Sequence, residues 1–264
     1  MLIDTHCHLD IMRAPIEDVV RRAQEEGVTT LITQGTNCES SAQALEIATK
    51  FPNVYATVGI HPEDIGEDFS VSNVRTFETL LNEKKVVGVG EVGLDYNLIA
   101  ESKVTSQKSI VKDRQTKLFS EQIKLATKYK KSLVIHNREA VEDVLLTLQE
   151  LWSPELEFHT VFHCCPADER LLQFAIIHHI YIGVDGDISW SKRKQRFIAQ
   201  VPLEMLVLET DAPYLVPLDL KGVEQENEPK NVTIVRDIVA RVKNTSWEVV
   251  ENVTTSNAMR LFQL

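Results

Sequence analysis

The hydrophobic and polar positions along the 264-residue chain alternate between two patterns. Short apolar runs, several of them nearly continuous, predict strands that are buried on both faces. Longer stretches between them repeat apolar residues at helical spacing and predict amphipathic helices. The strands are expected at 1–6, 29–34, 54–60, 86–91, 132–136, 159–163, 179–184 and 204–209. The helices are expected at 15–26, 39–50, 71–84, 113–130, 139–152, 167–178, 191–200, 230–243 and 247–262.

This alternation of strands and helices indicates a parallel sheet. Eight strands in ~250 residues fit a (β/α)₈ TIM barrel, with a doubly wound open sheet as the alternative. No linker rich in glycine or proline divides the chain, so residues 1–264 are expected to form a single domain. Two polar connections, 97–112 and 217–229, are long for a compact domain, and such loops are often functional.

The composition, 43% hydrophobic and 25% charged, is ordinary for a soluble globular protein. No apolar run approaches the ~20 residues that a membrane span needs, and the first residues lack the pattern of a signal peptide. A cytoplasmic protein without membrane contact is therefore expected. The net charge of −11 argues against nonspecific wrapping by nucleic acid, although a local basic patch stays open.

Two basic clusters are candidates for such a patch. Basic side chains contact phosphates, and an aromatic ring can stack on a base. One cluster follows the fourth strand, and it comprises Lys103, Lys108, Lys112, Arg114 and Lys117. The other follows the seventh strand and runs from Lys192 to Arg196, with Trp190 just before it. A solvated helix face is the alternative for both clusters.

The opening stretch "MLIDTHCHLD" places two histidines at the end of the first strand. Residues two apart in a strand point to the same face, so Asp4, His6 and His8 are expected on one face and Cys7 on the other. Further metal-capable residues come at or just after the ends of later strands: His61, Glu91, His136, His163 and Asp211. In a barrel all these strand ends open onto one face, where barrel active sites are built.

These residue types indicate a metal centre. Imidazoles and carboxylates bind divalent ions such as zinc, manganese, iron or nickel. Five or six ligands exceed the four that one tetrahedral ion needs, so two ions fit better. Paired ions activate a water and stabilise both the attacking and the leaving oxygen. The role of His61 stays open between a metal ligand, a substrate contact and a residue that shapes the "GIHP" turn.

Three segments of the chain resemble the signatures of the TatD family of metal-dependent deoxyribonucleases, which belongs to the amidohydrolase-like barrels. They are "LIDTHCHLD" (2–10), "SLVIHNREAVE" (132–142) and "PLEMLVLETDAPYL" (202–215). "GIHP" and "GEVGLDY" are similar to further landmarks of the family. The chain departs from the family pattern at Ser132, at "HCCPAD" (163–168), in the long loop 97–112, and at Glu226, where the family has arginine.

The resemblance implies a site with two divalent ions, which would be zinc, manganese or magnesium. The first ion would be held by His6, His8, Glu91 and Asp211. The second would be held by Glu91, His136 and His163, with Glu91 as the bridge. A hydroxide between the ions would attack phosphorus in line, and Asp211 would orient or deprotonate it, which makes Glu91 and Asp211 the catalytic residues. His61 and Arg138 would meet the phosphate, and Glu209 would support the ligands.

The sequence therefore predicts a cytoplasmic metal-dependent hydrolase that cleaves phosphodiester bonds in DNA, in single strands or at ends. A monomer or a small homo-oligomer is expected. An aminoacyl-tRNA deacylase and a small-molecule amidohydrolase are the alternatives, because the same metal chemistry cleaves other esters and amides. A non-catalytic scaffold is disfavoured by the intact set of ligands.

Overall fold

The computed structural model describes residues 1–65, 74, 76–97 and 105–264. Within these ranges eight parallel strands pair in chain order. They are β1 Leu2–Cys7, β2 Val28–Gln34, β3 Val54–Val58, β4 Val86–Asp95, β5 Ser132–Arg138, β6 Thr160–Phe162, β7 Tyr181–Val184 and β8 Leu206–Leu208. A bridge between Cys7 and Ala212 joins the β1 end to the segment after β8. The sheet therefore closes into the predicted barrel, and the open-sheet alternative is wrong.

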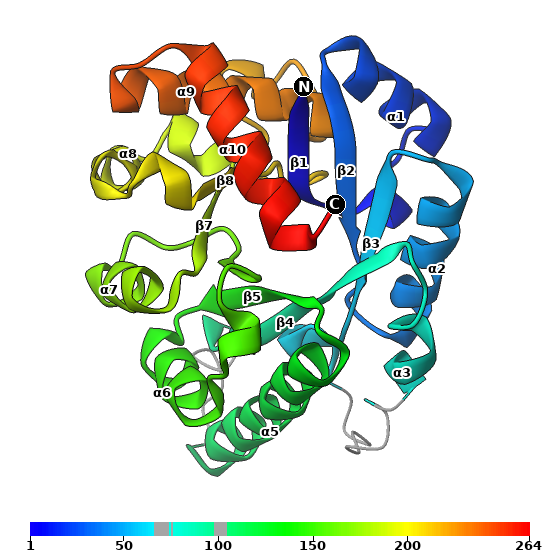
Figure 1. The fold of residues 1–264 in the computed structure, drawn as a ribbon, viewed down its shortest axis with the longest axis vertical. Coiled ribbons are helices and arrows are strands. Elements are labelled where there is room, and N and C mark those ends of the chain that lie inside the picture. Colours follow the sequence, from blue (N-terminus) through cyan, green and yellow to red (C-terminus); the bar gives the residue numbers. More distant parts are fainter. Residues whose placement is uncertain (66–73, 75, 98–104) are drawn as a thin grey trace.

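Helices surround the barrel, and most of them connect consecutive strands (Figure 1). In the described ranges they are α1 Ile16–Glu25, α2 Cys38–Lys50, α3 Phe77–Leu80, α5 Thr105–Tyr129, α6 Val141–Leu151, α7 Glu169–His178, α8 Lys192–Gln200, α9 Val232–Lys243 and α10 Trp247–Phe262. Their inward stripes pack on the outer faces of the strands and form the main hydrophobic core. Among the described residues, no helix combines the length and the apolar character that crossing a membrane requires.

The last helix covers one end of the barrel, as the red ribbon in Figure 1 shows. Leu261 and Phe262 of α10 are buried there, and they join a second hydrophobic cluster with the first inward residues of the strands. The strand members of this cluster are Ile3, Ile32, Val87, Val134, Val161, Tyr181 and Val207. This end lies at the amino-terminal side of the strands, so the opposite end is left for a site.

Two predicted elements differ from the structure. The loop expected at 97–112 ends early, because α5 already begins at Thr105, and residues 98–104 lie outside the described part. Ile110 and Val111 are exposed, so the early part of α5 offers no regular buried stripe by which hydrophobic periodicity could reveal it. Of the helix expected at 71–84, the structure has the short α3, and residues 71–73 and 75 are not described.

The strand ends also differ from the prediction, which moves two candidate residues. β4 continues to Asp95 and β5 to Arg138, so Glu91 and His136 lie within strands rather than at their ends. β6 and β8 are shorter than expected and stop at Phe162 and Leu208. The parallel strands of the barrel nevertheless bring these residues to one face, because the strands are staggered by their tilt.

Candidate metal centre

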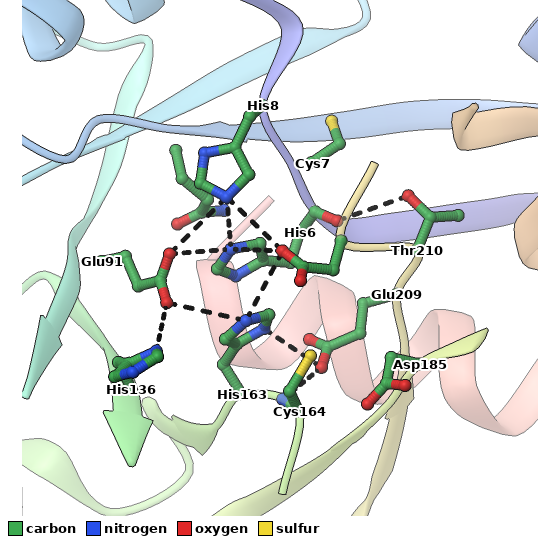
Figure 2. Close-up of polar contacts among 12 residues, drawn as sticks. His6, Cys7, His8, Glu91, His136, His163, Cys164, Asp185, Glu209 and Thr210 are labelled. Carbon is green, nitrogen blue, oxygen red and sulfur yellow. Dashed lines mark hydrogen bonds and ion pairs between the residues drawn. The ribbon is translucent and has the colours of Figure 1, made fainter. Parts of the chain in front are cut away.

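The candidate ligands converge on Glu91 at the open end of the barrel, as Figure 2 shows for His6, His8, His136 and His163. The Glu91 side chain is almost wholly buried, with 4% of its surface exposed. Its two carboxylate oxygens face different partners. Oε2 faces His6 and His8, at 3.2 and 3.6 Å from their Nε2 atoms. Oε1 faces His61, His136 and His163, at 2.7–3.6 Å.

The Oε2 side of Glu91 forms a compact group with His6, His8 and Asp211. Both Nε2 atoms, which are 3.3 Å apart, point at the same space. Asp211 Oδ1 lies 3.7 Å from His6 Nε2 and 3.4 Å from His8 Nε2. Four ligands at ~2.0–2.2 Å from a tetrahedral ion have donor atoms roughly 3.3–3.6 Å apart. The measured distances agree with this spacing, so the four side chains fit one divalent ion.

The Oε1 side of Glu91 has a different geometry. His136 Nδ1 lies 2.7 Å from Oε1, which is a hydrogen-bond distance. His163 Nε2 is 3.6 Å from the same oxygen and 3.7 Å from Asp211 Oδ1. The imidazoles of His6 and His163 stack with their centroids 3.4 Å apart. Ligand atoms of His61, Glu91 and His136 lie within 4.8 Å of one another and could hold an ion on this side.

The position of Glu91 depends on a glycine next to it. A Cβ atom at Gly90 would come within 2.6 Å of Val134 Cβ on the neighbouring strand, so only glycine fits there. The register of β4 against β5 shifts between Val89 and Val92. This irregularity, and the bond from Glu91 N to Gly35 O at 2.9 Å, fix the backbone that carries the central carboxylate.

The charges at the site perturb its pKa values in both directions. Burial would raise the pKa of Glu91, but the nearby histidines hold it well below its usual range. Burial would lower the pKa of His163, but the carboxylates of Glu209 and Glu91 raise it to about 10. Burial likewise opposes the charge on His136, yet Asp95 and Glu91 raise its pKa to about 9. A divalent ion bound here would displace these protons, because imidazole ligands must be neutral.

Asp95 is a functional candidate that the sequence analysis missed. Its carboxylate is 1% exposed, and Oδ2 lies 3.0 Å from His136 Nε2. An Nε2–H bond to Asp95 leaves Nδ1 of His136 free for a metal, which is the arrangement that orients many metal-binding histidines. The signal for Asp95 in the sequence is its place in the "GEVGLDY" segment, on the same predicted strand end as Glu91.

Glu209 and Asp4 support the ligands rather than joining them. Glu209 Oε1 lies 3.1 Å from His163 Nδ1 and accepts a bond from Cys164 N at 2.6 Å. The carboxylate of Asp4 accepts bonds from Thr210 N at 2.9 Å and Thr210 Oγ1 at 2.6 Å. Asp4, which was expected on one face with His6 and His8, therefore bonds Thr210 and does not join the donors around Glu91.

The reason is an irregularity in the first strand. The register of β1 against β2 shifts between Asp4 and Cys7, which breaks the simple alternation of side chains. Cys7 does point away from the site, as predicted, and its thiol faces the carbonyl of Ile32 (Figure 2).

His61 lies beside the Oε1 group and is held in one orientation. Its Nδ1 accepts a bond from Glu63 N at 3.2 Å, and its Nε2 is 3.6 Å from Glu91 Oε1. Burial lowers the pKa of His61 to about 4, so the ring is neutral at pH 7. A neutral ring that accepts at Nδ1 carries its proton on Nε2, and that N–H points into the site. Arg138, at the end of β5, is exposed.

The basic clusters are less available than the sequence predicted. Lys194 is 2% exposed, because α8 turns it toward the barrel, where Nζ donates to Cys165 O at 2.6 Å and lies 3.3 Å from Asp185 Oδ2. Lys194 is therefore not part of an exposed patch. The ring of Trp190 is covered by Lys221, whose Nζ lies 3.8 Å from the ring centre. Lys112 pairs with Asp143 at 3.7 Å.

Two other members of the second cluster have partners as well, because Arg193 donates to Ala167 O at 2.7 Å and Lys192 donates to Gln195 Oε1 at 3.3 Å. Lys117, Lys192, Arg193 and Arg196 are exposed. Lys103 lies outside the described residues.

The altered loop after β8 has its own stabilising contacts. Glu226, at the position where related sequences have arginine, accepts bonds from Arg13 N at 3.1 and 3.3 Å. Glu228 pairs with Arg22 through two bonds of 2.7 and 2.9 Å. Asn227 is fully buried and donates to Thr210 O, next to Asp211. Glu226 therefore stabilises the loop after β8 and adds no positive charge beside the site.

Comparison with known proteins places this geometry in context. The family profile described as TatD related DNase matches residues 3–263. An uncharacterized metal-dependent hydrolase of Bacillus subtilis, YabD, is 31% identical over the full length of both chains. The 3'-5' ssDNA/RNA exonuclease TatD of Salmonella typhimurium is 30% identical, with 94% of this chain and 93% of that protein covered. The crystal structure of YJJV, a TatD homolog from Escherichia coli, superposes with a TM-score of 0.86, at 28% identity, covering 100% of this chain and 98% of that one.

A parallel barrel whose open end gathers histidines around one buried carboxylate is the architecture of a metal-dependent hydrolase, the class to which the relatives are assigned. The chain belongs to the TatD family. It is an enzyme that hydrolyses ester bonds, and the family matches do not favour the deacylase and amidohydrolase alternatives.

Proposed function

We propose that this enzyme cleaves phosphodiester bonds in single-stranded DNA, acting at ends, with two divalent ions held on either side of Glu91. The observation that carries the proposal is the division of the Glu91 carboxylate, with Oε2 toward His6 and His8 and Oε1 toward His136 and His163. A carboxylate that serves two groups of donors is the arrangement that a two-ion hydrolase needs. The exonuclease named among the relatives supports nucleic acid as the substrate.

The ligand assignment follows the donor groups. His6, His8, Glu91 and Asp211 would hold one ion, and Glu91, His136 and His163 the other, with zinc, manganese or magnesium as candidates. Bound ions supply a Lewis acid that lowers the pKa of water and stabilises the charge on the reacting oxygens. The carboxylate of Asp211 is more exposed than the other ligands on its side, at 16%, and it is placed to orient an attacking water and accept its proton.

The substrate contacts come from the side of β3 and β5. His61 offers a fixed Nε2–H donor, because its Nδ1 is already an acceptor from Glu63 N. A ring in this tautomer suits a phosphate oxygen better than a metal ion, which supports a substrate contact as the role of His61. Arg138 would add a bidentate contact to the same phosphate. All these groups come from one chain, so a monomer would be sufficient for catalysis. A small homo-oligomer would contain one such site in each chain.

The test is hydrolysis of a 5′-labelled single-stranded oligonucleotide by protein loaded in turn with zinc, manganese and magnesium. Glu91→Ala should lower kcat/KM by roughly a thousandfold or more, because metal bridging contributes several kcal/mol to catalysis. Glu83→Ala removes an exposed carboxylate remote from the site and is the matched control. Hydrolysis of a simple phosphodiester without cleavage of DNA would contradict the substrate, and full activity of Glu91→Ala would contradict the site.

A further inference from the structure

An aromatic ring stands at the mouth of the candidate metal centre without any role in it. The centre of the Tyr214 ring lies 5.9 Å from that of His8, with the ring planes at 73°. The Tyr214 side chain is 54% exposed, whereas His8 beneath it is buried. One part of the ring therefore packs on a candidate ligand, and the rest is open to solvent.

The backbone around Tyr214 is held firmly. Tyr214 N donates to Asp211 O at 2.8 Å, and Asn227 N donates to Pro213 O at 2.9 Å. The buried amide of Asn227 also donates to Thr210 O and Leu215 O, on either side of the turn. A side chain carried by a backbone that is already held loses less conformational entropy on binding than one carried by a loose loop. This support distinguishes Tyr214 from a surface residue on a loose loop.

Other exposed or half-exposed aromatic rings do not share this position. Trp190 is covered by the ammonium group of Lys221. Trp247 is 46% exposed but begins α10, away from the donors, and its ring carries the guanidinium of Arg236 at 4.5 Å. In the part of the chain that the structure describes, Tyr214 is thus the exposed aromatic ring that touches the donor group.

We propose that the Tyr214 ring is a stacking subsite for a nucleobase next to the phosphodiester bond that is cleaved. The inference rests on the proposed function, since it assumes that the bond lies over Glu91. Every base presents a π-face, so stacking on one tyrosine binds single strands with little preference for sequence. The ring lies on the His8 side of the centre and His61 on the other, so the base and the phosphate have separate contacts.

The test compares two oligonucleotides that differ only in the bases of the last two nucleotides at the 3′ end, which are present in one and abasic in the other. Tyr214→Ala should lower kcat/KM on the complete oligonucleotide by roughly 5- to 100-fold, the range for losing one stacked base. On the abasic oligonucleotide the same variant should equal the wild type within about twofold. Tyr214→Phe keeps the ring and should stay near wild type on both, as should the remote control Trp247→Ala.

Equal losses on both oligonucleotides would overturn the proposal, since the ring would then act on the metal centre rather than on a base. No loss on either would overturn it as well. A binding measurement separates it from the proposed function. A 2-aminopurine base at the 3′ end should be quenched on binding to metal-free wild-type protein, and this quenching should disappear in Tyr214→Ala. Quenching without any hydrolysis by the loaded enzyme would keep the subsite and reject the nuclease, and unchanged quenching in the variant would reject the subsite.

Discussion

The two ends of the barrel are built from the same strands, yet they differ completely in chemistry. At the amino-terminal end, inward residues such as Val134, Val161 and Val207 pack against Leu261 and Phe262 of α10. Two residues further along the same strands, the inward positions are His136, His163 and Glu209.

The interior of the barrel thus changes from apolar to ionisable between one inward-facing residue and the next, two positions along the strand. The closed end and the site therefore depend on the same strands. His136, His163 and Glu209 each follow an inward residue that is packed in the hydrophobic cluster at the closed end, which limits their movement. The supporting carboxylates Asp95 and Glu209 are themselves almost fully buried. The open end can therefore hold charged groups at fixed distances, because the closed end supplies the stability for both.

The largest expected effect is at the closed end. Phe262→Ala should lower the free energy of unfolding by about 3–5 kcal/mol, because it leaves a cavity among fully buried side chains. The activity of the folded fraction should stay near wild type, since no donor contacts this ring. Urea unfolding and specific activity would be measured together. Met259→Ala, at a 40% exposed position of the same helix, is the control and should change stability by less than about 0.5 kcal/mol.

An intermediate effect is expected from metal at the open end. A divalent ion at 100 times its Kd should stabilise the protein by about 2.7 kcal/mol and raise Tm by on the order of 5 °C. His6→Ala should remove the part of this gain that comes from the ion bound by His6, whereas Phe262→Ala should keep the whole gain on top of a lower starting Tm. Thermal unfolding with zinc and with a chelator measures both. If Phe262→Ala removed the rise in Tm on metal binding and His6→Ala kept it, the assignment of stability to one end and metal binding to the other would be contradicted.

The smallest effect is expected from Asp95, the carboxylate that orients His136. Asp95→Asn keeps the shape of the side chain but removes the charge that faces His136 Nε2. Affinity for one of the two ions should fall by about 10- to 100-fold, as is common when such a partner is lost. Metal titration would show one weakened site and one unchanged site. If both sites kept their affinity, Asp95 would have no part in positioning His136.

Much of this architecture was predictable from the sequence, for identifiable reasons. His6, His136 and His163 come near the ends of apolar runs, which the sequence shows clearly as strands. In a parallel barrel such strand ends lie on one face, so the sequence also predicted where these histidines meet. Hydrophobic pattern could not reveal the first turns of α5, where Ile110 and Val111 are exposed. The run of basic residues likewise placed Lys194 in a cluster that faces solvent. Nothing in the sequence indicates that Asp185 lies 3.3 Å from the Lys194 ammonium group in the fold.

Register irregularities explain the other differences at the site. The shift in β1 between Asp4 and Cys7 turns Asp4 toward Thr210, and the shift in β4 places Glu91 inside a strand that continues to Asp95. Bulges of this kind re-aim side chains at active sites and leave no periodic signal. The positions near the strand ends therefore indicated His6, His8 and Glu91 in spite of these shifts, whereas the period of two failed for Asp4.

The most direct test of the central claim is the number of metal ions that each chain binds. Wild-type protein and Glu91→Ala would be dialysed against zinc and analysed by mass spectrometry of metal content, with Glu83→Ala as the control. We expect two ions per chain in the wild type and in the control, and one or none in Glu91→Ala, because both groups of donors share that carboxylate. Two ions retained in Glu91→Ala, or a single ion in the wild type, would contradict the assignment of Glu91 as the bridge between two metals.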